Sequence, residues 1–93
     1  MNTIETYTID YYIYTLNNGT IIKSTTKDNG GIKTNIKVSI TKDTHDIYTA
    51  FLYNKSGGPI ICDKNLESLK TKFIDALDAC FLVETFMSIN KKI

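Results

Sequence analysis

The chain has 93 residues, which is enough for one domain but would leave each of two separate cores too small to fold unaided. Hydrophobic residues make up 42% of the sequence and charged residues 23%, a balance typical of a globular domain and not of a disordered segment. Eleven basic residues, all Lys, accompany ten acidic ones. The net charge of +1 gives no general attraction for nucleic acid, and the lack of Arg argues against base-specific recognition.

The first part of the chain predicts a β-hairpin. Residues 6–16 are rich in Tyr, Thr and Ile, which suit a half-buried pleated surface, so we expect a strand there. Asn18 and Gly19 follow, and this pair is the strongest short hairpin signal because both residues accept positive φ in a type I′ turn. We expect the return strand at residues 20–26, and a second turn over Lys27–Gly31.

Three further strands are expected before the period changes. Residues 32–41 alternate strictly and predict a strand with one face in water and one on the core, the latter formed by Ile32, Thr34, Ile36, Val38 and Ile40. Residues 47–53 and 59–62 are the other two strands. Pro59 suits the first position of an edge strand, because Pro donates no hydrogen bond to a ladder.

The rest of the chain predicts one long helix at residues 66–91, with Asn65 as its N-cap and Glu67 favourably placed in its first turn. Its sheet-facing side is expected to contain the apolar residues spaced by three and four, namely Leu66, Leu69, Phe73, Ala76, Leu77 and Cys80. The whole chain is therefore expected to be a single α+β domain. It consists of an antiparallel sheet of about four to five strands, arranged in hairpins, followed by one C-terminal helix packed on one sheet face.

The end of this helix is too apolar for one sheet face to cover. The excess residues are Phe81, Leu82, Val83, Phe86, Met87 and Ile89. Three explanations remain open: the sheet or its first strand covers them, the helix end frays, or they form a homodimer or partner interface. Tyr12 and Tyr14 are further interface candidates, since Tyr combines an apolar ring with a polar tip.

The sequence offers no constellation for catalysis, for a metal or for a cofactor. His45 lies in a predicted turn beside two Asp residues, but no nucleophile or ligand set accompanies it at a recognised spacing. Cys62 and Cys80 have neither the number nor the spacing of a disulfide or zinc framework, and we expect both to be buried free thiols.

A nucleic-acid surface is the alternative from a different class. Aromatic residues with interleaved Lys on a sheet can stack single-stranded bases. Strand alternation places Tyr7 and Tyr11 on one face of the first strand and Tyr12 and Tyr14 on the other. The basic residues for such a surface, with RNA as the ligand, would be Lys23, Lys33 and Lys37.

Residues 47–79 contain an extended YTAF segment, a Gly-Gly hairpin and a polar cap before a helix with a Leu and Ala face. This order resembles HicB-like domains. The matching residues are Tyr48–Phe51, Gly57, Gly58, Asn65–Glu67, Leu69, Phe73, Ala76 and Leu77. The chain departs from that family's pattern before the helix, where the usual Pro- and Gly-containing segment is replaced by residues 60–64, and no DNA-binding module follows the helix.

The resemblance implies a non-enzymatic, protein-binding domain that often dimerises. The Arg-free, Ile-, Lys- and Asn-rich composition also resembles that of small phage products. We therefore expect a phage or mobile-element protein that binds a host or viral protein, either as an inhibitor of a defence system, such as an anti-CRISPR, or as an accessory virion component. No apolar run is long enough to span a bilayer, so the expected location is the host cytoplasm or the virion.

Overall fold

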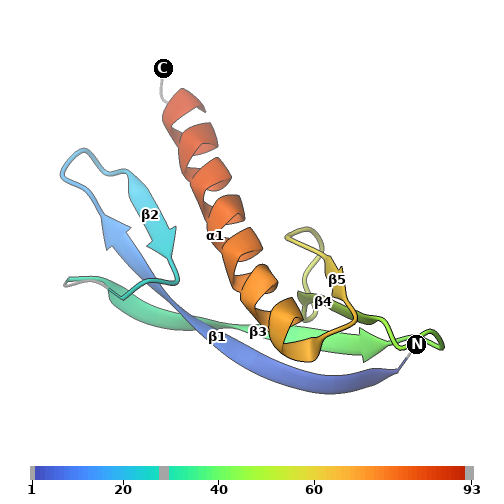
Figure 1. Cartoon of the computed structure of the whole chain (residues 1–93). Coiled ribbons are helices and arrows are strands. Elements are labelled where there is room, and N and C mark those ends of the chain that lie inside the picture. The colour runs from blue at the N-terminus through green and yellow to red at the C-terminus, as the bar shows by residue number, and fades with distance from the viewer. Residues whose placement is uncertain (1, 28–29, 92–93) are drawn as a thin grey trace.

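A computed structural model describes residues 2–27 and 30–91 and confirms the α+β class. Asp28 and Asn29, in the expected second turn, lie outside the described residues. One helix follows an antiparallel sheet of five strands (Figure 1). The elements are β1 (Thr3–Thr15), β2 (Ile21–Ser24), β3 (Ile32–Lys42), β4 (Tyr48–Leu52), β5 (Ile61–Asp63) and α1 (Leu66–Lys91).

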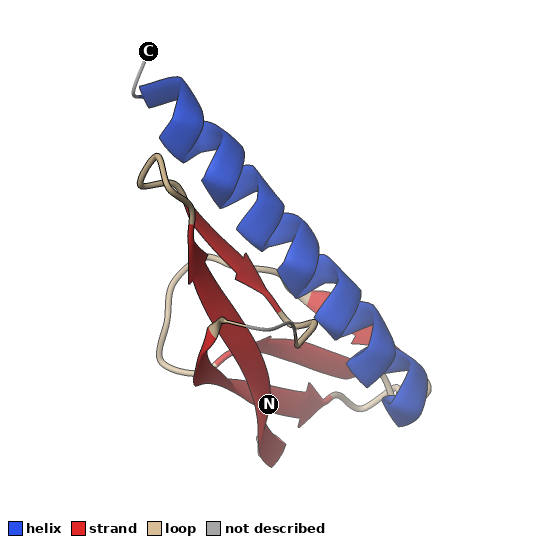
Figure 2. Ribbon diagram, turned by 90° about the vertical axis from the view of Figure 1, so that its left-hand side faces the viewer, coloured by secondary structure: helices blue, strands red, loops and turns tan. Residues whose placement is uncertain are grey.

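The strand order is β2-β1-β3-β4-β5, so the two longest strands occupy the interior of the sheet and the two shortest form its edges. β1 and β3 pair along most of their length, with Ile9 opposite Ile36. The sheet is strongly curved, and α1 runs obliquely across one of its faces (Figure 2). The C-terminal end of the helix extends past the sheet, so the two halves of α1 have different surroundings.

The core lies between the sheet and the first part of α1, as the helical spacing predicted. It consists of Ile9, Val38, Ile40, Ala50, Leu52, Leu69, Phe73, Leu77 and Phe81. Phe81 is the last core residue along the helix, and its ring lies 5.0 Å from that of Tyr11 between centroids. Tyr7 and Tyr11 both pack against this core, so they share one face of β1, as alternation predicted.

The Asn18-Gly19 hairpin forms, but with a different turn from the one expected. Within the loop only Gly19 has a positive φ, of 84°, whereas a type I′ turn needs two such residues. The Gly19 amide donates to the Leu16 carbonyl at 2.9 Å, and the Leu16 amide donates to the Thr20 carbonyl at 2.8 Å. The connection is therefore a three-residue loop that closes on one left-handed glycine.

Burial along β3 departs from the strict alternation that its sequence suggested. Ile32 is 71% exposed because it begins the strand at the end of the sheet that α1 leaves uncovered. On the opposite face Ser39 is 2% exposed, although a position in water was expected. β3 is an inner strand, and the small Ser39 side chain lies between its partners Thr6 and Phe51, which shield it from solvent.

Candidate interaction surface on the C-terminal helix

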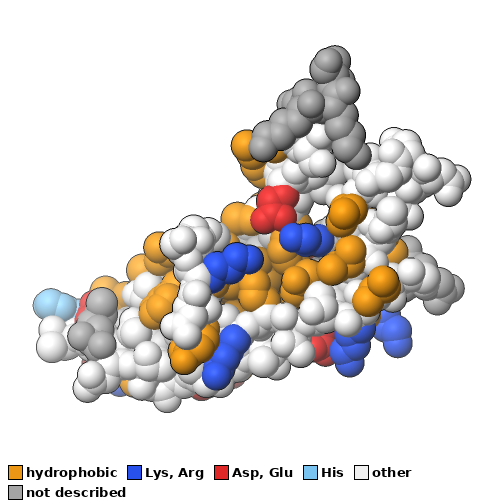
Figure 3. Space-filling model, turned by 180° about the vertical axis from the view of Figure 1, so that it is seen from behind, with side chains coloured by type: hydrophobic (Ala, Val, Ile, Leu, Met, Phe, Trp, Pro, Cys, Tyr) orange, Lys and Arg blue, Asp and Glu red, His pale blue; other side chains and the backbone are white. Residues whose placement is uncertain are grey.

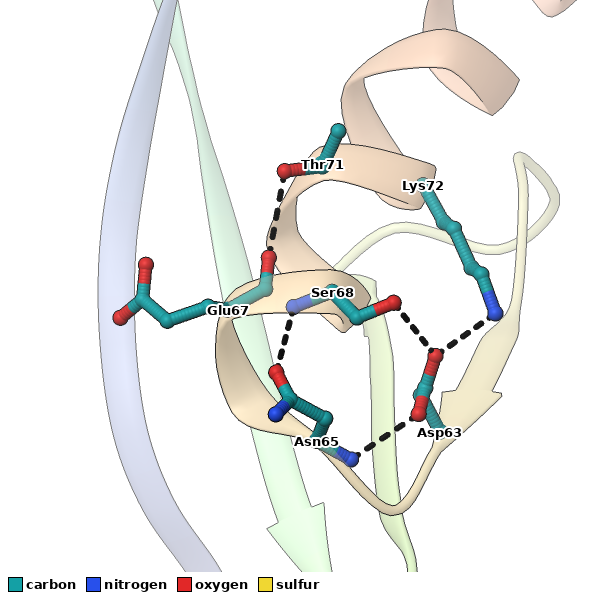
Figure 4. A network of polar contacts seen from close by, with 6 residues as sticks. All are labelled: Asp63, Asn65, Glu67, Ser68, Thr71 and Lys72. Carbon is teal, nitrogen blue, oxygen red and sulfur yellow. Dashed lines mark hydrogen bonds and ion pairs between the residues drawn. The ribbon is translucent and has the colours of Figure 1, made fainter.

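A capping network fixes the start of α1 (Figure 4). Asn65 is the N-cap, as expected, and its side-chain oxygen accepts a hydrogen bond from the Ser68 amide at 2.8 Å. Asp63, at the end of β5, accepts bonds from the Asn65 amide at 2.9 Å, the Ser68 hydroxyl at 2.9 Å and the Lys72 ammonium at 2.7 Å. The Lys72 hydrogen bond, followed by those from Asn65 and Ser68, holds the pKa of Asp63 well below its usual range. Within the helix, the Thr71 hydroxyl donates to the Glu67 carbonyl at 3.2 Å.

Polar contacts hold the C-terminal half of α1 to β2. The Asp78 carboxylate accepts hydrogen bonds from the Thr25 amide at 2.9 Å and the Thr25 hydroxyl at 2.5 Å. The Lys23 ammonium lies 3.2 Å from the Glu84 carboxylate and 5.8 Å from the centre of the Phe81 ring. On either side of Phe81, therefore, charged side chains of α1, Asp78 and Glu84, bond toward β2 and the residue that follows it.

The apolar residues of this half are mostly turned toward solvent, and of these Leu82 also borders a hollow beside β2. We call the set Leu82, Val83, Phe86, Met87 and Ile89 the outer apolar face; four of these side chains are 56–58% exposed and Ile89 is 39% exposed. Phe81 does not belong to this face, because at 5% exposed it is a core residue. On a helix the remaining residues cover a continuous arc, in which Leu82, Phe86 and Ile89 follow one another along one line.

Tyr12 and Tyr14 lie on the opposite side of the sheet from α1. On β1, Tyr12 is opposite Ser24 of β2 and Tyr14 is opposite Ile22, and all four lie on the face away from the helix. Tyr14 also lies so close to Gly31 that a Cβ added there would come within 2.6 Å of its ring. The two tyrosines and the outer apolar face are therefore separate surfaces, and the structure does not combine them into one site.

The three candidate lysines also lie on two different faces of the sheet. Lys23 points to the helix side of the sheet, where it pairs with Glu84. Lys33 and Lys37 lie on the uncovered face: Lys33 is 3.6 Å from Asp10, and Lys37 lies 4.5 Å from the centre of the Tyr53 ring. Only Lys33 and Lys37 can thus share a surface with Tyr12.

The remaining candidates for chemistry are dispersed. The Asp43 carboxylate accepts hydrogen bonds from the Ile47 and His45 amides, which lower its pKa and close the turn before β4. Cys62 is exposed on edge strand β5, which corrects the expectation that it is buried, and Cys80 is half-buried. Within residues 2–27 and 30–91, no group of three or more His, Cys, Asp or Glu side chains could hold a metal ion.

Hollows beside α1 bring together residues from different elements, among them Ile22 and Asp78, which the sequence did not single out. One of about 280 Å³ lies between β2 and the helix, and Ile22, Asp78 and Leu82 are among its lining residues. A second, of about 150 Å³, includes Tyr11, Pro59 and Phe81. Seen from behind, hydrophobic side chains occupy the middle of the molecule next to basic and acidic ones (Figure 3). No sequence pattern could have indicated that these residues lie together, because their proximity depends on how β2 and the 54–60 loop lie beside the helix.

Comparisons with known proteins add no family: no protein-family model, curated protein or solved structure matches this chain. In the part of the chain that the structure describes, no helix is long and apolar enough to cross a membrane.

Proposed function

We propose that this chain is a non-enzymatic protein-binding domain whose contact surface is the outer apolar face of α1. The observation that supports this most strongly is the orientation of side chains near the helix end, where polar groups face the sheet and apolar groups face water. Asp78 and Glu84 bond toward the sheet, while Leu82 and Phe86 are more than half exposed to water.

Exposed apolar surface of this kind is unfavourable in an isolated domain. Burying one such side chain contributes about 1.5–3 kcal/mol, so a folding domain would normally turn these residues inward. Contiguous apolar patches on small soluble proteins usually mark binding sites, and an aromatic residue near the centre of a patch is a common energetic anchor. Phe86 has that position here.

The finer version of the proposal concerns the partner. From the HicB-like resemblance and the phage-like composition, we infer a small phage or mobile-element protein that binds a host or viral protein. An inhibitor of a defence system, such as an anti-CRISPR, would be recovered with a host protein. An accessory virion component would instead be recovered with particles, and this difference separates the two roles.

Affinity capture with matched variants tests the proposal. Wild type, Phe86→Asp and Met87→Asp would each be used to capture proteins from host lysate, identified by mass spectrometry and then rebound in purified form. We expect wild type to retain its partner and both variants to lose it, because a carboxylate in an apolar contact has no compensating hydrogen bonds.

The control is Ile60→Asp. Ile60 is 69% exposed before β5 and does not belong to the outer apolar face, so its replacement should leave binding unchanged. If Phe86→Asp and Met87→Asp both unfold the isolated domain, as judged by circular dichroism, these residues are core residues and the proposal fails.

A nucleic-acid function is the second candidate, favoured by one observation. Lys33, Lys37 and Tyr12 lie together on the sheet face that α1 leaves uncovered, although Asp10 pairs with Lys33 there. Titration with single-stranded RNA at two salt concentrations separates the two functions. An RNA binder would show a steep loss of affinity with salt, whereas the protein-binding domain should show no binding at either concentration.

A further inference from the structure

The molecule has more surface than its mass accounts for. A compact monomer of 10.5 kDa is expected to expose about 5400 Å², whereas this chain exposes 6459 Å². Its radius of gyration is 15.0 Å, against about 12 Å for a compact domain of this length. The excess of about 1000 Å² is close to the roughly 800 Å² that each partner buries in a standard protein interface.

Part of the excess has the spacing of a helix-pairing seam. One line of residues along α1 recurs at intervals of three, four and three, as the a and d positions of a coiled coil do, and it consists of Ala79, Leu82, Phe86 and Ile89. All four side chains are exposed, and none carries a charge. Val83 flanks the seam and widens it.

We propose that this seam binds the same seam of a second copy, so that the chain forms a two-fold homodimer through antiparallel α1 helices. The proposal rests on the protein-binding function above and names the partner. A second copy fits because the seam is uncharged along its length, so no like charges meet when two identical surfaces come together.

Side-chain volumes set the orientation. In an antiparallel pair centred between Leu82 and Phe86, these two residues face each other, and the small Ala79 faces the larger Ile89. A parallel pair would place Phe86 against Phe86 and Ala79 against Ala79, with crowding at one level and a void at the other. It would also bring the two copies of Asp75 together, which the antiparallel pair separates by the length of the seam.

The interface is small, and the dimer should accordingly be reversible. Taking roughly 150–200 Å² for each fully exposed residue, at the low end of the area that large side chains bury, exposed fractions of 39–58% leave about 400–550 Å² on the outer apolar face of each copy. This lies below the standard interface size, so we expect a dissociation constant in the micromolar range, which rises when Phe86 is replaced.

Sedimentation velocity over protein concentrations from about 1 to about 500 µM tests self-association. Wild type should shift from monomer to dimer, Phe86→Asp should remain a monomer that melts at the temperature of dilute wild type, and Ile60→Asp should dimerise like wild type. A wild-type chain that stays monomeric throughout, or Phe86→Asp that still dimerises, would overturn the homodimer. If the homodimer is overturned but wild type captures a different protein that Phe86→Asp does not, the protein-binding function is supported and only the homodimer is rejected.

Cysteine cross-linking tests the orientation. In a background with Cys62→Ser and Cys80→Ser and with an added thiol oxidant such as copper phenanthroline, a mixture of Ala79→Cys and Ile89→Cys chains should form a disulfide dimer, and Ala79→Cys alone should not. Efficient cross-linking of Ala79→Cys with itself would instead show a parallel pair and overturn the arrangement proposed.

Discussion

Asp78 of α1 binds both the amide and the hydroxyl of Thr25, so a single carboxylate holds the end of β2 to the helix. Hydrogen bonds to a charged group typically contribute about 1.5–3 kcal/mol. We expect Asp78→Ala to lower the free energy of unfolding by about 2 kcal/mol and to speed hydrogen exchange of the Thr25 amide. Asp75→Ala is the control, since Asp75 is exposed on the same helix. Equal exchange rates in both variants would show that the contact does not hold β2.

Replacing the N-cap should weaken α1 from its first turn. Asn65→Ala removes the acceptor for the Ser68 amide and should lower the free energy of unfolding by about 1 kcal/mol. Urea denaturation monitored by circular dichroism would measure the loss. Asn65→Asp retains a capping oxygen and should preserve stability. If its free energy of unfolding falls as much as that of Asn65→Ala, loss of the capping bond does not explain the destabilisation.

Acid should weaken the same end of the helix through Asp63. Because its folded pKa is depressed, Asp63 contributes stability that is fully present above about pH 4 and is lost as the pH falls through the folded pKa. Denaturation of wild type and Asp63→Asn from about pH 7 to about pH 2 should therefore show a gap in stability that narrows in acid. Asp46→Asn, whose carboxylate is 83% exposed beside Lys42, should track wild type across this range. A gap that stays constant with pH contradicts the assignment.

The Tyr7 hydroxyl is buried and has no hydrogen-bond partner among the residues that the structure describes. Burial, with a smaller contribution from Glu5, raises the pKa of Tyr7. Removing an unpaired buried hydroxyl eliminates its desolvation penalty, so Tyr7→Phe should increase stability by up to about 1 kcal/mol in thermal or urea unfolding. Tyr53→Phe, at an exposed ring, should change stability by less than about 0.5 kcal/mol. A clear loss in Tyr7→Phe would show that the hydroxyl is paired.

Phe81 and Phe86 lie five residues apart on one helix, and truncation should destabilise the monomer at Phe81 but not at Phe86. Phe81→Ala removes a core ring and should lower the free energy of unfolding by about 3–5 kcal/mol. Phe86→Ala should change the stability of the monomer by no more than about 0.5 kcal/mol, measured where the chain is dilute enough to be monomeric. Similar large losses in both variants would place Phe86 in the core.

Local sequence signals were sufficient for the elements but not for their arrangement. The period change after Cys62 and the capping residue Asn65 located α1, whose observed bounds match the expected range. The order β2-β1-β3 was not predictable, because hairpin signals report on neighbouring strands and not on the side of β1 to which β3 adds. Burial of Ser39 depends on that order, since it follows from having strands on both sides.

The candidate surface was predictable only in part, for a related reason. Apolar excess at the end of α1 identified the region, but residue type alone did not distinguish Phe81 from Phe86. Their difference arises from Tyr11, which meets Phe81 at a point fixed by the curvature of β1. The separation of Lys23 from Lys33 likewise required the register between β1 and β2.

The two edge strands, β2 and β5, have only four and three residues. Because β2 is so short, it pairs only with Tyr12–Thr15 of β1, and the backbone of residues 3–11 has no neighbouring strand on that side within the described residues. Such an open stretch is where an extended foreign strand would pair through main-chain hydrogen bonds. The outer apolar face proposed for binding depends instead on side chains of α1, so substitutions there would leave this edge of the sheet unchanged.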